Sequence, residues 1–310
     1  MNLDYPKQVR LREVGPRDGF QNIHAFIPTE TKLATIRALA KAGLHEIEVT
    51  SFVSPKVIPQ MADAEQVLAG LAGLDIIRSV LVPTPKRAEQ AIAAGADELI
   101  VFLSASEAHN RANVNRSISE SLAGLDAIFT LARDSGTPVI GAVAVSFGCP
   151  YEGKVPLEQV LELAAAFRDA GADGLVFGDT TGMANPQIVT SFVKAYQDRF
   201  SNTDFSLHFH NNRGTAMANL LAAMSAGATT FDTALGGTGG CPTVPKAAGN
   251  LATEDVVGVL DQMDIETGVD LDALIVASRE MESALGIELA GQVMKSGPVD
   301  WNPSIQHMPS

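Results

Sequence analysis

Apolar and polar positions along the chain follow two alternating patterns. Runs of apolar and β-branched residues of strand length, such as Val9–Val14 and His45–Phe52, are each followed by a longer stretch in which apolar residues recur every three or four positions. In the first such stretch, residues 29–42, Thr29 is placed to cap the start of a helix and Gly43 to close its end. The pattern therefore predicts a regular alternation of strand and helix.

This alternation continues through eight strands, each followed by a helix. The strands are predicted at 9–14, 45–52, 76–82, 98–103, 138–146, 174–178, 206–210 and 230–235. The helices that follow them are predicted at 29–42, 61–71, 85–94, 117–132, 157–170, 186–200, 214–226 and 253–262. An unbroken series of this kind favours an α/β fold, the (β/α)8 or TIM barrel, over the alternative of a doubly wound open sheet.

The chain shows no linker or break in composition, so residues 1–310 are expected to form a single domain. We expect the barrel over about 9–265 and a C-terminal helical extension over about 270–310. That extension holds one helix, 271–285, and an irregular end that starts at Met294.

Composition and charge narrow the class of protein. Hydrophobic residues make up 46% and charged residues 19% of the chain, which excludes intrinsic disorder. The net charge of −14 works against nucleic-acid and anionic-membrane partners. No apolar run is long enough to span a bilayer, no targeting leader is visible, and the only cysteines are Cys149 and Cys241. We therefore expect a cytoplasmic protein. Proteins of this length and composition are most often enzymes.

In a barrel of this type the active site lies at the carboxyl ends of the strands. The seventh strand ends in His208-Phe209-His210, and residues two apart on a strand point the same way. His208 and His210 therefore project together, as a pair of imidazoles that suits a divalent metal ion. The alternative is two core histidines satisfied by hydrogen bonds.

Polar residues also end other strands. The first strand runs into Arg17-Asp18, the second carries Glu48 among apolar neighbours, and the sixth ends at Asp179. Each has a structural alternative, since Asp18 and Asp179 could cap turns and Glu48 could be an internal hydrogen-bonding partner.

Asp18, His208 and His210 offer one carboxylate and two imidazoles, and Asn250 could add a neutral oxygen. Such a mixed oxygen and nitrogen set favours Mg²⁺ or Mn²⁺ over Zn²⁺. The glycine-rich segment 236–242 lacks the Lys-Ser/Thr of a phosphate-binding loop, so it reads either as a lid that carries Cys241 or as a plain turn.

These motifs together resemble those of the hydroxymethylglutaryl-CoA lyases. The resemblance covers about residues 9–275 and includes EVGPRDGFQN, IEVTSFVSPK, GCPYEGK, GDTTG, HFHNNRG, GGTGGCP and AAGNLATED, which begin at residues 13, 47, 148, 178, 208, 236 and 247. The related isopropylmalate- and citramalate-synthase branch lacks the GGxGGCP loop and carries a further C-terminal domain. The loop therefore favours cleavage.

The resemblance implies a role for each matching residue. Asp18, His208, His210 and Asn250 would bind the divalent cation, Arg17 would stabilise the enolate oxygen, and Cys241 would be the acid/base group of the lid. Glu48 and Asp179 would lie around the metal and the reacting hydroxyl, Glu254 would support the shell, and Gln21 and Ser51 would line the cavity.

The implied reaction is carbon–carbon cleavage of the oxo-acid-lyase type. A 3-hydroxy-3-methylglutaryl-CoA-like substrate would split in retro-aldol fashion into acetyl-CoA and acetoacetate, as in leucine degradation, and family members are often dimers or larger. The alternatives are a lyase for a related 3-hydroxyacyl-CoA such as citramalyl-CoA, a Claisen synthase or aldolase, and a non-catalytic metabolite-binding barrel.

The chain departs from the family pattern at the rim of the cavity. His24, Thr84, Asn211 and Arg213 stand where the family commonly has other residues. None is a presumed metal ligand, so these departures bear on the identity of the substrate and leave the reaction type unchanged.

Overall fold

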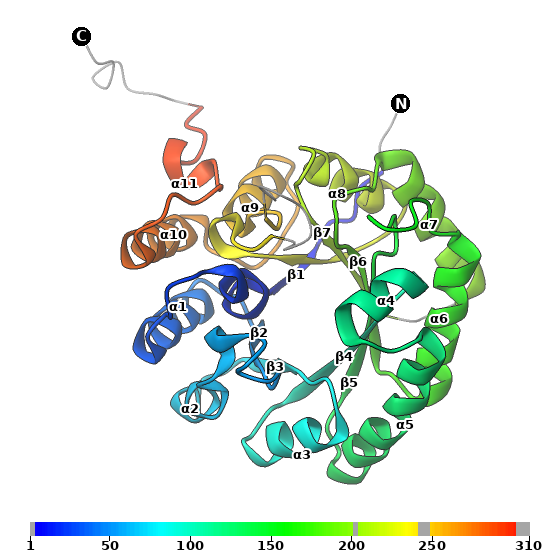
Figure 1. Cartoon of the computed structure of the whole chain (residues 1–310). Coiled ribbons are helices and arrows are strands. Elements are labelled where there is room, and N and C mark those ends of the chain that lie inside the picture. The colour runs from blue at the N-terminus through cyan, green and yellow to red at the C-terminus, as the bar shows by residue number, and fades with distance from the viewer. Residues whose placement is uncertain (1–3, 201–203, 241–248, 302–310) are drawn as a thin grey trace.

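The strands of the computed structural model, which describes residues 4–200, 204–240 and 249–301, form a closed barrel (Figure 1). Each strand pairs in parallel with its sequence neighbours, and the first pairs with the last. The strands are β1 (Arg10–Glu13), β2 (Glu46–Ser51), β3 (Ile77–Leu81), β4 (Glu98–Ser104), β5 (Val139–Ala144), β6 (Gly174–Asp179), β7 (Phe205–Phe209) and β8 (Thr230–Thr233). The predicted TIM barrel is confirmed and the open sheet is excluded.

Helices surround the barrel, and the C-terminal helices α10 and α11 lie beside α9 and α1 (Figure 1). The helices are α1 (Thr29–Lys41), α2 (Ala64–Gly70), α3 (Pro85–Ala93), α4 (Glu107–Val114), α5 (Ile118–Ser135), α6 (Leu157–Ala170), α7 (Pro186–Arg199), α8 (Ala216–Ser225), α9 (Thr253–Gln262), α10 (Leu271–Leu285) and α11 (Val293–Ser296). The predicted C-terminal helical extension is present, but its end, predicted to be irregular from Met294, begins with the short helix α11. That residues 1–310 form one lyase domain stays a prediction.

The strands present apolar side chains to the helices, and β1, β7 and β8 present polar side chains to the barrel interior. On β7, Phe209 packs outward against Phe147, with ring centroids 6.1 Å apart. On β6, Phe177 packs against Phe192 of α7 at 4.7 Å. The alternate residues of β7 are polar, and His208 is one of them. The main hydrophobic core therefore lies between the barrel and the helices, while the barrel interior holds charged groups such as Arg12 together with apolar residues such as Ile140.

Several local predictions were wrong for identifiable reasons. Helix α4 was missed because its sequence, EAHNRANV, has almost no apolar periodicity; Ser106 caps it and Asn115 ends it in the left-handed region. Thr29 does not cap α1 but lies inside it, where its hydroxyl donates to Asp63 Oδ2 at 2.8 Å. Gly43 follows α1 with φ +100°, as predicted.

The end of β7 is tied to the segment that follows the glycine-rich loop. The strand stops one residue earlier than predicted, and His210 instead forms an isolated antiparallel bridge with Asn250. The Leu251 N–H donates to the Phe209 carbonyl at 3.2 Å, and the Asn211 N–H to the Gly249 carbonyl at 2.9 Å. This bridge brings residues 40 positions apart to one edge of the barrel.

Helix α5 offers a test of local stabilisation. Ser117 and Glu120 form a reciprocal capping box: Ser117 Oγ accepts from the Glu120 N–H at 3.0 Å, and Glu120 Oε2 accepts from the Ser117 N–H at 2.7 Å. Ser117→Ala is expected to lower the free energy of unfolding by about 1 kcal/mol. Urea denaturation measures this. Thr130→Ala, on the exposed face of the same helix, is the control, and an equal loss in both variants would contradict the capping role.

Candidate metal centre

Asp18, His208 and His210 come together at the carboxyl ends of β1 and β7. One potential ligand atom from each lies within 4.8 Å of the others. The Nε2 atoms of the two histidines are 3.1 Å apart, and His210 Nε2 is 3.7 Å from Asp18 Oδ2. The two imidazoles thus project to the same side, as the i, i+2 spacing predicted.

The second nitrogen of each imidazole determines where its proton lies. His208 Nδ1 is 3.3 Å from Asp232 Oδ2, and His210 Nδ1 is 2.8 Å from the Thr180 carbonyl oxygen. A carboxylate and a carbonyl only accept hydrogen bonds, so both Nδ1 atoms carry a proton, and each Nε2 presents a lone pair when its ring is neutral. The two Nε2 atoms are 3.1 Å apart, close enough to share one proton or to bind one cation together. With the Asp18 carboxylate beside them, this donor set fits a divalent metal ion.

The Asp18 carboxylate is held from three sides. Its Oδ1 accepts from Arg17 Nη1 and from Gln21 Nε2, each at 2.9 Å, and its Oδ2 accepts from Asn250 Nδ2 at 2.8 Å. Burial opposes ionisation, but the neighbouring His210, Arg17 and His208 hold the pKa of the Asp18 carboxyl well below its usual range. The carboxylate is therefore ionised at neutral pH and available to a cation.

Asn250 reaches this group through its amide nitrogen. Besides Asp18, Nδ2 donates to the Thr238 carbonyl at 2.9 Å. In the described conformation Asn250 orients Asp18.

The partly buried Arg17 and the buried Glu48 form an ion pair next to Asp18. Arg17 Nε lies 3.2 Å from Glu48 Oε1. Burial raises the pKa of Glu48 to about 7, even though the Arg17 charge acts in the opposite direction. Ser51, at the end of β2, is fully buried, and its hydroxyl has no hydrogen-bond partner among the described residues. This end of the barrel therefore holds polar groups whose bonding capacity is not used up.

Asp179, the last residue of β6, has one occupied and one open oxygen. Its Oδ1 accepts from the N–H groups of Met183 at 2.7 Å and Ala184 at 3.0 Å. Its Oδ2 is buried with no hydrogen-bond partner within the described part of the chain. Burial raises the pKa of this carboxyl. Asp179 thus caps the turn that follows β6, as one of the two interpretations predicted, and keeps a second oxygen without a partner in the described residues.

Glu254 and the two cysteines are the remaining predicted or candidate reactive residues. Glu254 is buried in α9 and accepts from the Gly236 N–H at 3.0 Å at the start of the glycine-rich loop. Burial raises its pKa to about 7. Cys241 lies outside the described residues. Cys149 is a buried free thiol whose sulfur is 2.9 Å from Ser106 Oγ, which suits packing.

The sequence reasoning overlooked two buried carboxylates, Glu13 and Asp232. Glu13 Oε1 accepts from the N–H groups of Gly15 at 2.8 Å and Leu235 at 2.9 Å, and its Oε2 accepts from Thr253 Oγ1 at 2.6 Å. It thus joins the turn after β1 to the loop after β8 and to the start of α9. The signal available was an acidic residue within each predicted strand, in VRLREV and in TFDTAL.

The fold and the site define a class: a (β/α)8-barrel protein with a candidate divalent-metal centre at the carboxyl ends of its strands. A family model described as HMGL-like matches residues 8–281. The chain belongs to this family. Relatives at least 40% identical to it are named hydroxymethylglutaryl-CoA lyases.

The similarity extends over nearly the whole chain. A hydroxymethylglutaryl-CoA lyase of Bacillus subtilis is 44% identical over 95% of this chain and 100% of its own length. The human mitochondrial hydroxymethylglutaryl-CoA lyase is 40% identical over 94% of this chain and 90% of its own length. An HMG-CoA lyase from Acinetobacter baumannii, solved with coenzyme A and 3-methylmalate, is 41% identical with a TM-score of 0.91, over 96% of this chain and 98% of that one.

None of the helices in the described residues combines the length and apolarity that crossing a bilayer requires.

The Glu13 carboxyl gives the fold a predictable pH dependence. Burial raises its pKa from 4.5 to about 7, so between these values the folded protein binds a proton that the unfolded chain has released. Its contribution to stability therefore falls as pH rises through this window. Glu13→Gln keeps an oxygen for the two N–H groups and offers an amide to Thr253, and it cannot ionise.

We expect the stability difference between Glu13→Gln and wild type to shift in favour of the variant, by on the order of 1–3 kcal/mol, between about pH 5 and about pH 8. Urea denaturation in EDTA measures it. Glu89→Gln, at an exposed site, is the control. Stability curves for Glu13→Gln and wild type that run parallel across this range would rule out the assignment.

Proposed function

We propose that this protein is a divalent-metal-dependent carbon–carbon lyase that cleaves 3-hydroxy-3-methylglutaryl-CoA into acetyl-CoA and acetoacetate. The observation that carries the proposal is the ligand group of Asp18, His208 and His210 beside the Arg17–Glu48 ion pair. It occurs in a chain at least 40% identical, over 94% or more of its length, to proteins named hydroxymethylglutaryl-CoA lyases. A relative solved with coenzyme A supports an acyl-CoA as the substrate.

The metal ion would be held by Asp18, His208 and His210, with the side-chain oxygen of Asn250 as a further ligand, and Mg²⁺ or Mn²⁺ are the preferred ions for this donor set. When bound, it supplies the positive charge that lowers the pKa of the substrate hydroxyl. We assign to Asn250 and Gln21 the task of holding Asp18 in place, since both donate hydrogen bonds to its carboxylate.

The acid/base roles follow from charge and burial. Glu48 and Asp179 have raised pKa values and are the groups available to accept the hydroxyl proton as the C2–C3 bond breaks. The Arg17 guanidinium provides the positive charge that opposes the negative charge developing on the thioester oxygen. Cys241 would return a proton to the enolate carbon, a role that rests on the resemblance of its loop. Ser51 would contribute its free hydroxyl to the cavity wall, and Glu254 would support the lid at Gly236.

We propose hydroxymethylglutaryl-CoA as the substrate in preference to citramalyl-CoA or longer homologues. Three of the residues that depart from the family pattern bond to backbone groups. Thr84 caps α3, Asn211 Oδ1 accepts from the Ala216 N–H, and Arg213 Nη1 donates to the carbonyls of Thr181 and Gly182 at 2.7 and 2.8 Å. These contacts support the rim loops without engaging the ligand group.

We also propose a compartment, a pathway and an oligomeric state for this protein. A free buried Cys149 suits a reducing compartment such as the cytoplasm, and the products suit leucine degradation. Size-exclusion chromatography with light scattering would test the predicted homo-oligomer.

The first experiment is metal-dependent cleavage. Protein stripped with EDTA should be inactive, and Mg²⁺ or Mn²⁺ should restore equimolar release of acetyl-CoA and acetoacetate from hydroxymethylglutaryl-CoA. We expect His208→Ala to abolish turnover, and Arg17→Gln and Cys241→Ala to lower kcat by about 10²–10⁴-fold. Arg37→Gln, which removes an exposed guanidinium bound to the Gly70 carbonyl, is the matched control for Arg17.

Failure of folded, metal-loaded protein to cleave this substrate would refute the proposal. Condensation of acetyl-CoA with a 2-oxo acid would then identify a synthase, cleavage of a CoA-free 4-hydroxy-2-oxo acid an aldolase, and tight acyl-CoA binding without turnover a binding protein.

The choice of substrate has its own test. We expect kcat/KM for hydroxymethylglutaryl-CoA to exceed that for citramalyl-CoA by about tenfold or more, since a well-shaped pocket distinguishes one substituent by 1–3 kcal/mol. A higher value for citramalyl-CoA would reverse the assignment and return attention to His24, Thr84 and Asn211 at the rim.

A further inference from the structure

Asp232 lies between the candidate metal centre and a cluster of charged side chains toward the amino-terminal end of the barrel. We call this the charge cluster; it consists of Arg12, Glu46 and Glu98. Asp232 is a residue of β8 and is 5% exposed. In the strand register it pairs with Arg12 of β1 on one side and with His208 of β7 on the other. Neighbouring residues in register point to the same side of a sheet, so all three side chains face the barrel interior.

The two oxygens of Asp232 have different partners. Oδ2 faces His208 Nδ1 at 3.3 Å. Oδ1 accepts from Ser206 Oγ at 3.0 Å and lies 3.7 Å from Arg12 Nη1. A carboxylate bound in this way cannot rotate without losing contacts on both sides. Ser206 and Arg12 therefore determine the orientation of the Asp232 carboxylate, and this carboxylate in turn constrains the His208 imidazole.

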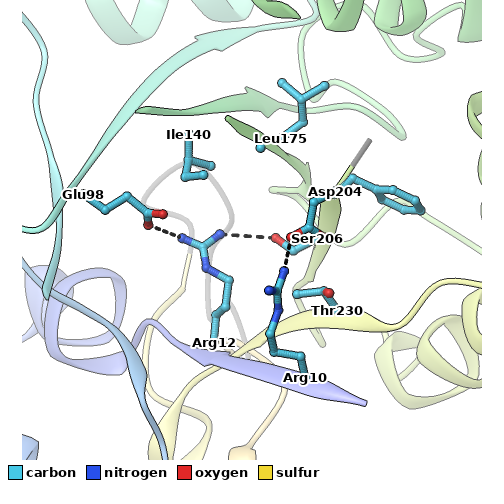
Figure 2. A pocket seen from close by; sticks show the side chains of 10 residues that line it. Arg10, Arg12, Glu98, Ile140, Leu175, Asp204, Ser206 and Thr230 are labelled. Carbon is cyan, nitrogen blue, oxygen red and sulfur yellow. Dashed lines mark hydrogen bonds and ion pairs between the residues drawn. The ribbon is translucent and has the colours of Figure 1, made fainter. Parts of the chain in front are cut away.

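Arg12 connects this carboxylate to the amino-terminal end of the barrel. Its Nη2 donates to Glu98 Oε1 at 3.4 Å, and its Nε lies 3.5 Å from Glu46 Oε2. Figure 2 shows Arg12 reaching Glu98 on one side and Ser206 on the other, in a small pocket that residues at the starts of several strands line. A continuous row of polar contacts thus runs from that end of the barrel to His208.

We propose that Asp232 is a positioning residue for the metal centre: it keeps the proton of His208 on Nδ1, and thereby keeps the Nε2 lone pair directed at the cation. Arg12 and Ser206 hold Asp232 in the orientation that this requires. The inference rests on the proposed metal site and adds a residue that need not touch metal or substrate. The charge cluster would then act on the metal centre through the contact between Arg12 and Asp232.

The substitution Asp232→Asn tests the tautomer with almost no change in volume. Arg12 and Ser206 both donate toward the Oδ1 position, so the amide oxygen is favoured there and the amide nitrogen faces His208. The amide nitrogen donates, which requires His208 Nδ1 to accept and moves the ring proton to Nε2. The lone pair that would bind the cation is then lost.

Two measurements read this out. The dissociation constant for Mn²⁺, from the electron paramagnetic resonance signal of the free ion, should rise about 10–100-fold in Asp232→Asn. Independently, ¹⁵N NMR of histidine-labelled, metal-free protein at alkaline pH should show His208 with its proton on Nδ1 in wild type and on Nε2 in the variant. His208→Ala assigns the signals.

The matched control is Asp97→Asn. Asp97 also pairs with an arginine, Arg78, at 2.7 Å, but faces no histidine, so Mn²⁺ affinity should stay within about twofold of wild type. If Asp232→Asn lowers the melting temperature yet keeps wild-type Mn²⁺ affinity and the Nδ1 tautomer, Asp232 is merely structural and the inference is wrong. Wild-type protein that binds no Mn²⁺ would overturn the metal site itself, and with it this inference.

Discussion

The alternation of side chains along parallel strands is the constraint on which the rest of the structure depends. In a closed ring of strands, every second residue points into a narrow interior where water is scarce, so each polar group there needs a protein partner. Outward positions such as Phe177 and Phe209 build the core with the helices. Inward positions such as Arg12, His208 and Asp232 pair with one another. The same geometry thus produces the core and the site.

The fold could be predicted from the sequence because its signals are local. The periods of apolar residues gave the bounds of α6 and α9 without error, and the i, i+2 spacing gave the common direction of His208 and His210. What the sequence could not supply were partners distant along the chain. The Thr29 hydroxyl bonds to Asp63 rather than to its own helix, and Asn250 reaches His210 through a bridge between loops.

Asp232 and Glu13 show the same limit at the site. An acidic residue inside a predicted strand is compatible with a ligand, a structural acceptor or a positioning group, and only the register decides among them. Glu13, Glu48 and Glu254 are all buried, and burial raises the pKa of each to about 7. Clustering such groups at one end of a barrel opposes stability and is a common mark of a site selected for chemistry.

The position of the ligand group also affects how the barrel stays closed. Asp18 follows β1 and the two histidines belong to the end of β7, while the seam where the sheet closes lies between β1 and β8. An ion bound there would join the first quarter of the chain, which holds Asp18, to the third quarter, which holds both histidines, at a point that no covalent link spans. At a free ion concentration of a hundred times the Kd, binding would stabilise the closed barrel by about 2.7 kcal/mol. A protein divided into half-barrels would therefore rebuild its ion site only when the two halves reassociate, which makes ion binding a direct reporter of barrel closure.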